Sequence, residues 1–362
     1  MDSFETFPEQ PEAKRLLRAA LAEDAPAHAY LFHGPRGVGK RRAALAFAAE
    51  LIGSQDRVLR HAHPDVYPLE PIGDQIRIGD IRELRHDLHM RPFEAQRRVY
   101  LIYDADTMNE DAADALLKDL EEPPPYAVMV LVASDLGPIP ETIRSRCQLV
   151  PFRRLSERAV RDEIEGRAPG LEPEEMTALA RVAGGRLDRV DRLLDPAAAK
   201  RRDALLTLAR DVYRDPTFEP GDAAAGILAA AAERGADARE AAEKELEALD
   251  LTQREADQRL RRAQRGAERE ELLASLEELA AWYRDLVVVA TGAERAAIHS
   301  DRLAELSEDA TLDRLAGAER ACELVRQVWR ELEEFNLNAE LALESLFVRL
   351  RRELALNLVL ES

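Results

Sequence analysis

Residues 34–41, which read GPRGVGKR, constrain this chain more than any other segment. They match the phosphate-loop pattern G-x-x-x-x-G-K-[ST] at every fixed position except the last, where Arg41 replaces Ser or Thr. The apolar stretch Ala29–Phe32 precedes the loop and the helical run Arg42–Leu51 follows it. This order of strand, loop and helix is the context that the motif requires. We therefore expect a parallel α/β domain with the loop at a strand end.

The sequence of this loop predicts a phosphate site in which Mg²⁺ binding is impaired. Gly34, Gly37 and Gly39 let backbone N–H groups turn toward phosphate oxygens, and Lys40 is placed to reach the outer phosphates of a nucleotide. The missing hydroxyl normally binds Mg²⁺, whereas the guanidinium of Arg41 has no acceptor lone pair and repels a dication. We expect these five residues to bind ATP or ADP weakly, and we expect the protein to require no cofactor.

Short apolar segments alternate with helical ones up to residue 154, which predicts parallel βαβ units. The expected strands are Ala29–Phe32, Asp65–Leu69, Val99–Tyr103, Val128–Ala133 and Leu149–Phe152. The expected helices between them are Pro11–Ala22, Arg41–Leu51, Ile78–Met90 and Glu110–Leu120.

Strand signals fade after residue 154. Residues 155–215 begin with three short helical segments, Ser156–Glu165, Pro173–Ala183 and Arg186–Leu194, and are expected to form a small helical domain. Residues 216–362 are expected to form an all-α domain. Within it, Glu240–Tyr283 is rich in Glu, Arg, Ala and Leu, and predicts a long helix or a helical hairpin with solvated faces. A surface helix without a specific role is the simpler interpretation of that stretch.

Charge and composition exclude several classes of protein. The formal net charge of -19 argues against a general nucleic-acid coat, so contact with DNA is expected to be local or through a partner. Cys147 and Cys322 are the two cysteines, too few for a disulfide framework, and this suits a reducing cytoplasm. The chain carries neither a signal-peptide pattern nor an apolar run that could span a bilayer. We expect a soluble, cytoplasmic protein without membrane contact.

The strand at residues 98–103 ends where a phosphate-loop ATPase places two acidic residues, one for Mg²⁺ and one for the attacking water. Here Tyr103 and Asp104 fill these positions, or Asp104 and Ala105 if the alignment slides by one residue. Either way one carboxylate is lost. Asp104 and Asp106 are alternatively solvated turn residues.

Two further segments follow: residues 115–124 read ALLKDLEEPP and residues 140–147 read PETIRSRC. Taken alone, the first suits an amphipathic helix and Arg146 in the second suits a surface arginine. The whole series, from the phosphate loop through the VYLI strand to these segments, resembles the clamp-loader branch of AAA+ proteins over about residues 13–152. Weaker similarity to the helical collar of these proteins lies at residues 281–286 and 336–344. The resemblance implies an AAA+ P-loop domain, a three-helix lid and a helical collar.

Departures from the family pattern concern the nucleotide site. Asp188 stands where active relatives carry a sensor arginine, although Arg186 or Arg189 could substitute, and Ser134 corresponds to the residue that senses the γ-phosphate.

Relatives often carry a four-cysteine zinc module before a His-Pro-Asp sequence. This chain has His63-Pro64-Asp65 without those cysteines. His61 and His63 cannot supply a tetrahedral site alone, so we expect surface histidines, no zinc and no other metal.

Arg146 is the part of the family chemistry that is retained. The resemblance implies an arginine finger that acts in trans on the ATP site of a neighbouring motor subunit. The resemblance further implies that the chain is a non-motor subunit without intrinsic ATPase activity, and that it assembles with motor and delta subunits in a hetero-pentameric ring. Its contact with the sliding clamp and primed DNA is indirect. The alternatives are an active AAA+ ATPase that relies on Lys40 and Asp104, and a small-molecule kinase with a helical lid.

Overall fold

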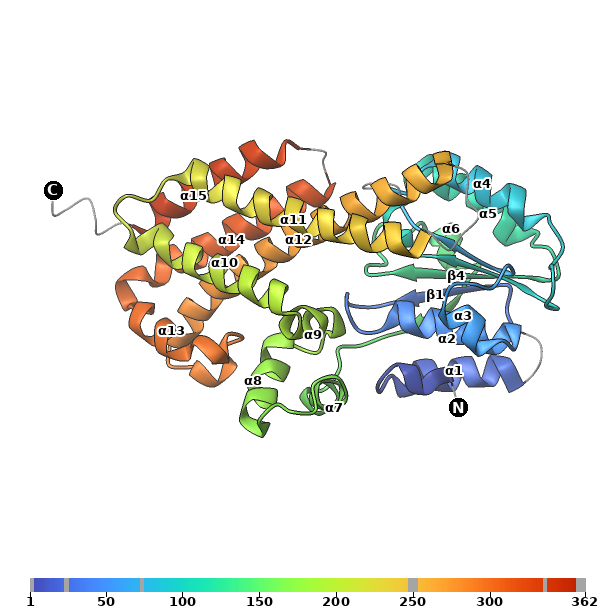
Figure 1. Ribbon diagram of the computed structural model, residues 1–362, viewed down its shortest axis with the longest axis horizontal. Coiled ribbons are helices and arrows are strands. Elements are labelled where there is room, and N and C mark those ends of the chain that lie inside the picture. The colour runs from blue at the N-terminus through green and yellow to red at the C-terminus, as the bar shows by residue number, and fades with distance from the viewer. Residues whose placement is uncertain (1–2, 23–25, 72–74, 247–252, 335–336, 356–362) are drawn as a thin grey trace. The chain divides into compact units, whose positions relative to one another are not determined.

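The computed structural model describes residues 3–22, 26–71, 75–246, 253–334 and 337–355. These residues divide into two compact units, Met1–Asp191 and Arg192–Ser362 (Figure 1). The lid range 155–215 crosses this division, because the helix that begins at Pro196 belongs to the second unit. The three-domain division of the chain stays a prediction.

The first unit is built on a five-stranded sheet in the order β2-β3-β4-β1-β5. Every strand pair is parallel, as the alternation of strands and helices predicts. The strands are β1 (Ala29–His33), β2 (Val66–Leu69), β3 (Arg98–Ile102), β4 (Ala127–Ala133) and β5 (Gln148–Pro151). The predicted α/β fold is confirmed, and each observed strand overlaps its predicted range.

Both faces of the sheet are buried, because side chains alternate between two hydrophobic clusters. In β1, Tyr30 and Phe32 join one cluster while Ala29 and Leu31 join the other. The central strands β3 and β4 divide in the same way. This two-sided burial explains why the strands read as continuous apolar runs in the sequence.

Helices cover the two faces of the sheet (Figure 1). The helices α1 (Pro11–Ala22), α2 (Lys40–Ile52) and α3 (Gln55–Leu59) contribute to the first cluster. The helices α4 (Ile78–Leu88), α5 (Glu110–Glu121) and α6 (Glu141–Arg144) contribute to the second. Short 3-10 turns, η1 (Ser3–Thr6) and η2 (Ala105–Thr107), precede α1 and follow β3.

The three short helices expected after the sheet are α7 (Glu157–Arg167), α8 (Pro173–Ala183) and α9 (Leu187–Leu194). Local sequence signals set their ends. The Ser156 hydroxyl accepts a hydrogen bond from the Ala159 N–H at 3.1 Å and caps α7. Pro173 opens α8, and Gly184 closes it in the left-handed conformation.

The second unit is helical throughout its described residues. The charged stretch 240–283 falls on two helices that pack along one another, so of the two predicted arrangements the hairpin is present, with its connection at 247–252 outside the described residues. The collar-like segment 336–344 is described from Leu337, and Asn338 caps its helix. The helices and turns are α10 (Pro196–Arg214), α11 (Pro220–Leu246), α12 (Gln253–Ala290), η3 (Glu294–Ala296), η4 (Ser300–Arg302), α13 (Leu303–Asp309), α14 (Leu312–Glu334) and α15 (Ala339–Leu354). No helix in the described ranges has the length and apolar character needed to cross a bilayer.

A buried histidine stabilises the core of this second unit. His299 is fully buried, and its Nδ1 and Nε2 lie 2.8 Å from Asp285 Oδ2 and 3.2 Å from Glu278 Oε1. Its ring also meets the edge of Trp282. Burial works to lower the pKa of His299, but hydrogen bonds to the two carboxylates outweigh it and raise the pKa above the ordinary value. Two arginines also donate hydrogen bonds to these carboxylates: Arg202 to Glu278 and Arg284 to Asp285.

We expect replacement of His299 by Gln to lower the free energy of unfolding of this unit by about 1.5–3 kcal/mol in mildly acidic solution. Because the folded pKa is raised, the stabilisation is complete below the unfolded pKa of about 6.5 and is lost as the pH rises through the folded value. Both tryptophans, Trp282 and Trp329, lie in this unit, so urea unfolding followed by tryptophan fluorescence reports it selectively. A difference between H299Q and wild type that stays constant from about pH 6 to 9 would contradict this assignment.

Candidate nucleotide site and trans-acting arginine

The phosphate loop joins β1 to α2 at the carboxyl edge of the sheet. Gly34, Gly37 and Gly39 have φ values of +137°, +72° and +95°, in the region that favours glycine. A Cβ at Gly34 would also lie 2.1 Å from the carbonyl oxygen of Phe152. The sequence therefore forms the loop that the motif predicts, and the glycines are required by backbone geometry and by close packing.

The Lys40 side chain forms hydrogen bonds with its own phosphate loop. Its Nζ donates hydrogen bonds to the carbonyl oxygens of Gly34 at 2.5 Å and Pro35 at 2.6 Å, and the residue is only 6% exposed. Burial lowers the pKa of Lys40 to about 8, against the opposing attraction of Asp106 and Asp104. A bound phosphate would have to replace these two carbonyl contacts.

Arg41 occupies the strand edge at which the motif normally holds a cation. Its guanidinium donates to Glu70 Oε1 at 2.9 Å and to Asp104 Oδ2 at 2.6 Å. Its Cζ lies 4.6 Å from the ring centroid of Tyr103. Asp104 is therefore a partly exposed turn residue that pairs with Arg41, and a metal ion would have to displace the guanidinium to reach it.

Asp106 connects the ends of two neighbouring strands. Its Oδ2 accepts hydrogen bonds from the backbone N–H groups of Ser134 and Asp135, each at 3.0 Å. Burial outweighs these hydrogen bonds and raises the pKa of Asp106. Asp106 is thus not a solvated turn residue, because its carboxylate satisfies backbone donors after β4. The contact places Ser134 at the same edge as the loop, while its sensor role stays a prediction.

A carboxylate from the lid helix α9 lies against the phosphate loop. A Cβ at Gly37 would fall 1.6 Å from Asp188 Oδ1, and the Leu187 N–H donates to the Gly37 carbonyl at 2.6 Å. Burial works to raise the pKa of Asp188, but Arg186, which binds both carboxylate oxygens, outweighs it and lowers the pKa. A carboxylate that is paired with Arg186 therefore lies beside the loop, at the position where the sequence comparison expects a sensor arginine in active relatives.

Arg146 lies at the opposite edge of the sheet from the loop. It precedes β5 by two residues, whereas the loop follows β1, and the two strands run parallel. Its guanidinium donates to the Thr142 carbonyl at 2.9 Å and to Glu121 Oε1 at 2.6 Å. The side chain is 36% exposed. Arg146 is therefore separate from its own nucleotide loop and reachable from solvent.

The structure corrects one histidine assignment. His61 is exposed as expected, but His63 is buried, because its Nδ1 accepts a hydrogen bond from the Asp65 N–H at 3.1 Å. Asp65 in turn accepts from the backbone N–H groups of residues 93–95. His63 thus belongs to the packing that precedes β2. Among the described residues, no group of three or more His, Cys, Asp and Glu side chains is placed to hold a metal.

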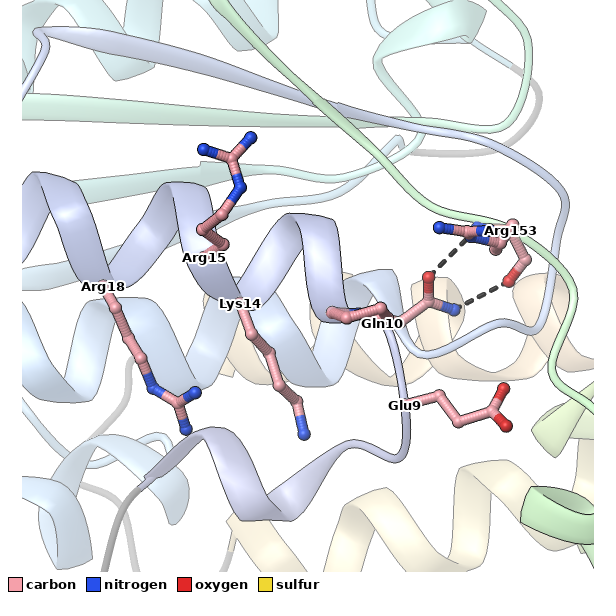
Figure 2. Close-up of a pocket in the computed structure, with 7 residues that line it drawn as sticks. Glu9, Gln10, Lys14, Arg15, Arg18 and Arg153 are labelled. Carbon is pink, nitrogen blue, oxygen red and sulfur yellow. Dashed lines mark hydrogen bonds between the residues drawn. The ribbon is translucent and has the colours of Figure 1, made fainter.

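Two residues of this site were not anticipated from the sequence. Glu70 directly follows β2 and binds Arg41, and its place after a predicted strand was the available signal. Gln10 is 2% exposed and binds the backbone of Arg153 on both sides: Nε2 donates to the carbonyl at 2.7 Å and Oε1 accepts from the N–H at 3.1 Å (Figure 2). Since these partners are 143 residues apart, no local pattern marks the contact.

A five-stranded parallel sheet, a phosphate loop after β1 and a small helical lid define a P-loop protein of the AAA+ type. Comparison with known proteins makes this more specific. Residues 9–156 match the family described as DNA polymerase III, delta subunit. The DNA polymerase III subunit delta' of Bacillus subtilis (strain 168) is 34% identical over 167 residues, 43% of this chain and 51% of that protein. The delta' subunit of Pseudomonas aeruginosa is 35% identical over 136 residues, 33% of this chain and 42% of that protein.

Residues 9–156 therefore match the DNA polymerase III delta-subunit family, and the chain is similar to delta' subunits. The tau subunit of Bacillus subtilis (strain 168) is also similar, with 28% identity over 219 residues, 56% of this chain and 39% of that protein. A DNA polymerase III gamma subunit-related protein from Thermotoga maritima has a TM-score of 0.48 and 18% identity, over 94% of this chain and 99% of that chain. The chain matches about half the length, or less, of these curated relatives.

We expect Asp188→Asn to strengthen binding of ATP by about tenfold, or about 1.4 kcal/mol, because it removes a negative charge beside Gly37. Titration with a fluorescent ATP analogue measures the change. Asp191→Asn is the matched control, since Asp191 lies on the same helix but pairs with Arg167. Equal affinity of D188N and D191N would contradict a repulsive role for Asp188.

The Arg41→Thr substitution is expected to make nucleotide binding depend on Mg²⁺. It releases Asp104 and Glu70 from the guanidinium and supplies the hydroxyl that the motif lacks. Titration calorimetry with ATP, in Mg²⁺ and in EDTA, should give similar affinities for the native chain and at least about tenfold tighter binding in Mg²⁺ for R41T. Strong Mg²⁺ dependence in the native chain would show that Arg41 does not block the metal.

Proposed function

We propose that this protein is the delta-prime, non-motor subunit of a DNA polymerase III clamp loader, and that Arg146 acts as its arginine finger. It assembles with the motor and delta subunits in a hetero-pentameric ring. Through that ring it takes part in loading the sliding clamp on primed DNA during replication. Its own nucleotide site is degenerate, and it has no intrinsic ATPase activity.

The observation that carries the proposal is the separation of two sites on one sheet. At the carboxyl edge, Arg41 pairs with Asp104 and Glu70, and Asp188 lies on the loop. Each of these contacts works against magnesium-assisted hydrolysis by this chain. At the amino edge, Arg146 is partly exposed and is too far along the strand direction to serve its own loop. An arginine in this place suits an ATP site on an adjacent subunit.

The contacts of Arg146 within the chain allow its side chain to move to a phosphate on a neighbouring subunit. Its ion pair with Glu121 joins side chains that are 36% and 51% exposed. Pairs of this kind contribute only about 0.2–1 kcal/mol. A triphosphate on a neighbouring subunit offers a stronger, charge-assisted partner, so the guanidinium can exchange Glu121 for phosphate at small cost.

The relatives also support a place within a clamp loader. Both a delta' and a tau subunit of DNA polymerase III are similar to this chain, over 167 and 219 residues. The motor-type alternative relies on Lys40 and Asp104, and both side chains have partners within the chain. Single-turnover ATP hydrolysis by the isolated chain distinguishes the two functions: brisk hydrolysis favours the motor, and none favours the proposed subunit.

We expect Arg146→Ala to leave folding and ring assembly intact and to reduce hydrolysis at the one ATP site that it serves by about 10³-fold or more. Clamp-dependent ATPase of the reconstituted loader is the measurement, with gel filtration to verify assembly. Arg144→Ala is the matched control, because Arg144 ends α6 only two residues before Arg146 and pairs with Glu141. Normal turnover by a loader that contains R146A would refute the role of this residue.

A further inference from the structure

Three arginines in the first half of α12 are a feature of the second unit that the proposed function does not use. Arg261, Arg262 and Arg265 lie close together in the sequence of this helix. Arg261 and Arg265 are exposed, and Arg262 is half-buried. Within the part of the chain that the structure describes, none of the three side chains forms an ion pair or a hydrogen bond. Their guanidinium groups are therefore available to a ligand.

The three arginines share one face of the helix. Successive residues of an α-helix are about 100° apart, so Arg261 and Arg265 differ by about 40° and lie one turn apart along the axis. Arg262 lies about 60° beyond Arg265. All three thus fall within a sector of about 100°, and one ligand surface that runs along α12 can contact all of them.

The rest of α12 places no opposing charge in this sector. The buried residues Leu260 and Ala267 lie on the other side of the helix, where α11 runs along α12 (Figure 1). By the same spacing of about 100° per residue, no acidic residue of the described stretch 256–271 falls within the sector. The nearest ones, Asp257 and Glu268, border it on one flank. The sector itself is therefore positive along its length.

Cations of the neighbouring helix α11 are paired within that helix. Arg239 donates to Glu243 at 3.1 Å, and Lys244 donates to Glu240 at 2.7 Å, in each case across one turn. In a chain whose net charge is -19, acidic groups are plentiful. The α12 arginines are thus a local exception, and a local excess of positive charge attracts an anion.

Phosphate is the anion that this row of arginines suits. A guanidinium donates paired, charge-assisted hydrogen bonds to phosphate oxygens. Arg261 and Arg265 are about 6 Å apart along the helix axis, and a nucleic-acid duplex presents one negative charge per about 3.4 Å on each strand. The row therefore matches about two neighbouring phosphates of one strand.

Two other kinds of partner fit this face less well. Protein partners are usually held by aromatic or large apolar anchors, and the large hydrophobic residues that the described second unit exposes all lie outside α12. Single strands are usually held by stacking on aromatic rings, and the aromatic residues of α12, Trp282 and Tyr283, are fully buried. A duplex backbone needs only positive charge, so it is the partner that the observations favour.

We propose that Arg261, Arg262 and Arg265 bind the phosphate backbone of a nucleic-acid duplex without reading its bases. DNA and RNA duplexes offer the same phosphate groups, so both belong to the proposed class of ligand. The site shares no residue with the phosphate loop or with Arg146, and it does not depend on the clamp-loader role. It gives the chain a direct contact with nucleic acid, whereas in the proposed function that contact is through the ring.

The test measures binding of fluorescently labelled DNA and RNA duplexes to the full chain by anisotropy, at about 50 mM salt. Labelled polyglutamate and a single-stranded oligothymidylate are titrated in parallel. The triple variant R261A/R262A/R265A should weaken duplex binding at least tenfold. The matched control removes the same charge from exposed positions on three other elements of the second unit and should bind like wild type: K200A/R295A/R352A.

Salt dependence adds a second readout. Each phosphate contact contributes about 0.9 to the slope of log K against log salt, so loss of three contacts should reduce the size of that slope by about 3. Binding of either duplex with both effects supports the proposal and identifies the kind of nucleic acid. The proposal is overturned if neither duplex binds, if the slope is unchanged, or if the two triple variants lose the same affinity. Tighter binding of polyglutamate or of the single strand than of either duplex also overturns it.

Alanine favours helix, so the triple variant is expected to keep its fold, and urea unfolding followed by tryptophan fluorescence verifies it. If the half-buried Arg262 proves necessary for folding, R261A/R265A replaces the triple variant, because both of its side chains are exposed. This double variant is expected to weaken duplex binding at least fivefold. Unchanged affinity in a folded R261A/R265A chain overturns the proposal as well.

Discussion

The parallel pairing of five strands is the constraint on which the first unit depends. Because parallel strands end at one edge, the residues that follow β1, β2, β3 and β4 meet there, although they are far apart in the chain. The loop at 34–41, Glu70, Asp104 and Asp106 are brought together in this way. The same rule places Arg146, which precedes β5, at the other edge. One sheet therefore separates the phosphate loop and the side chains around it from Arg146.

The residues around the phosphate loop contact one another with groups that a bound nucleotide and metal would otherwise contact. Arg41 provides a positive charge to Asp104, Lys40 donates to carbonyls of its own loop, and Asp188 lies beside Gly37. Of these groups only Lys40 is buried, so its two hydrogen bonds satisfy a charge that would be costly to leave unpaired. Replacing all of them with a triphosphate and Mg²⁺ requires several exchanges at once, which is the physical reason to expect weak binding.

Periodicity and motif order predicted much of the first unit. The apolar runs mark the strands because both faces of the sheet are buried, and each strand overlaps its predicted range. The loop glycines were predicted from the motif, and their positive φ values agree with it. The partners of individual side chains were harder to predict from the sequence. His63 was expected on the surface but accepts a hydrogen bond from the Asp65 N–H. A solvated turn was one of two alternatives for Asp106, which accepts hydrogen bonds from two N–H groups after β4.

By itself the sequence determined the α/β fold of the first unit, the helical character of the rest, and the positions of the glycines, Lys40 and Arg146. These follow from local preferences and from spacing, which depend on neighbours in the chain. Only the tertiary structure decided that Arg41 pairs with Asp104 and Glu70, that Asp188 lies beside the loop, and that Gln10 joins the Arg153 backbone to Val38. Those contacts join residues 28 or more positions apart, and side-chain geometry across folded elements decides them, not local pattern.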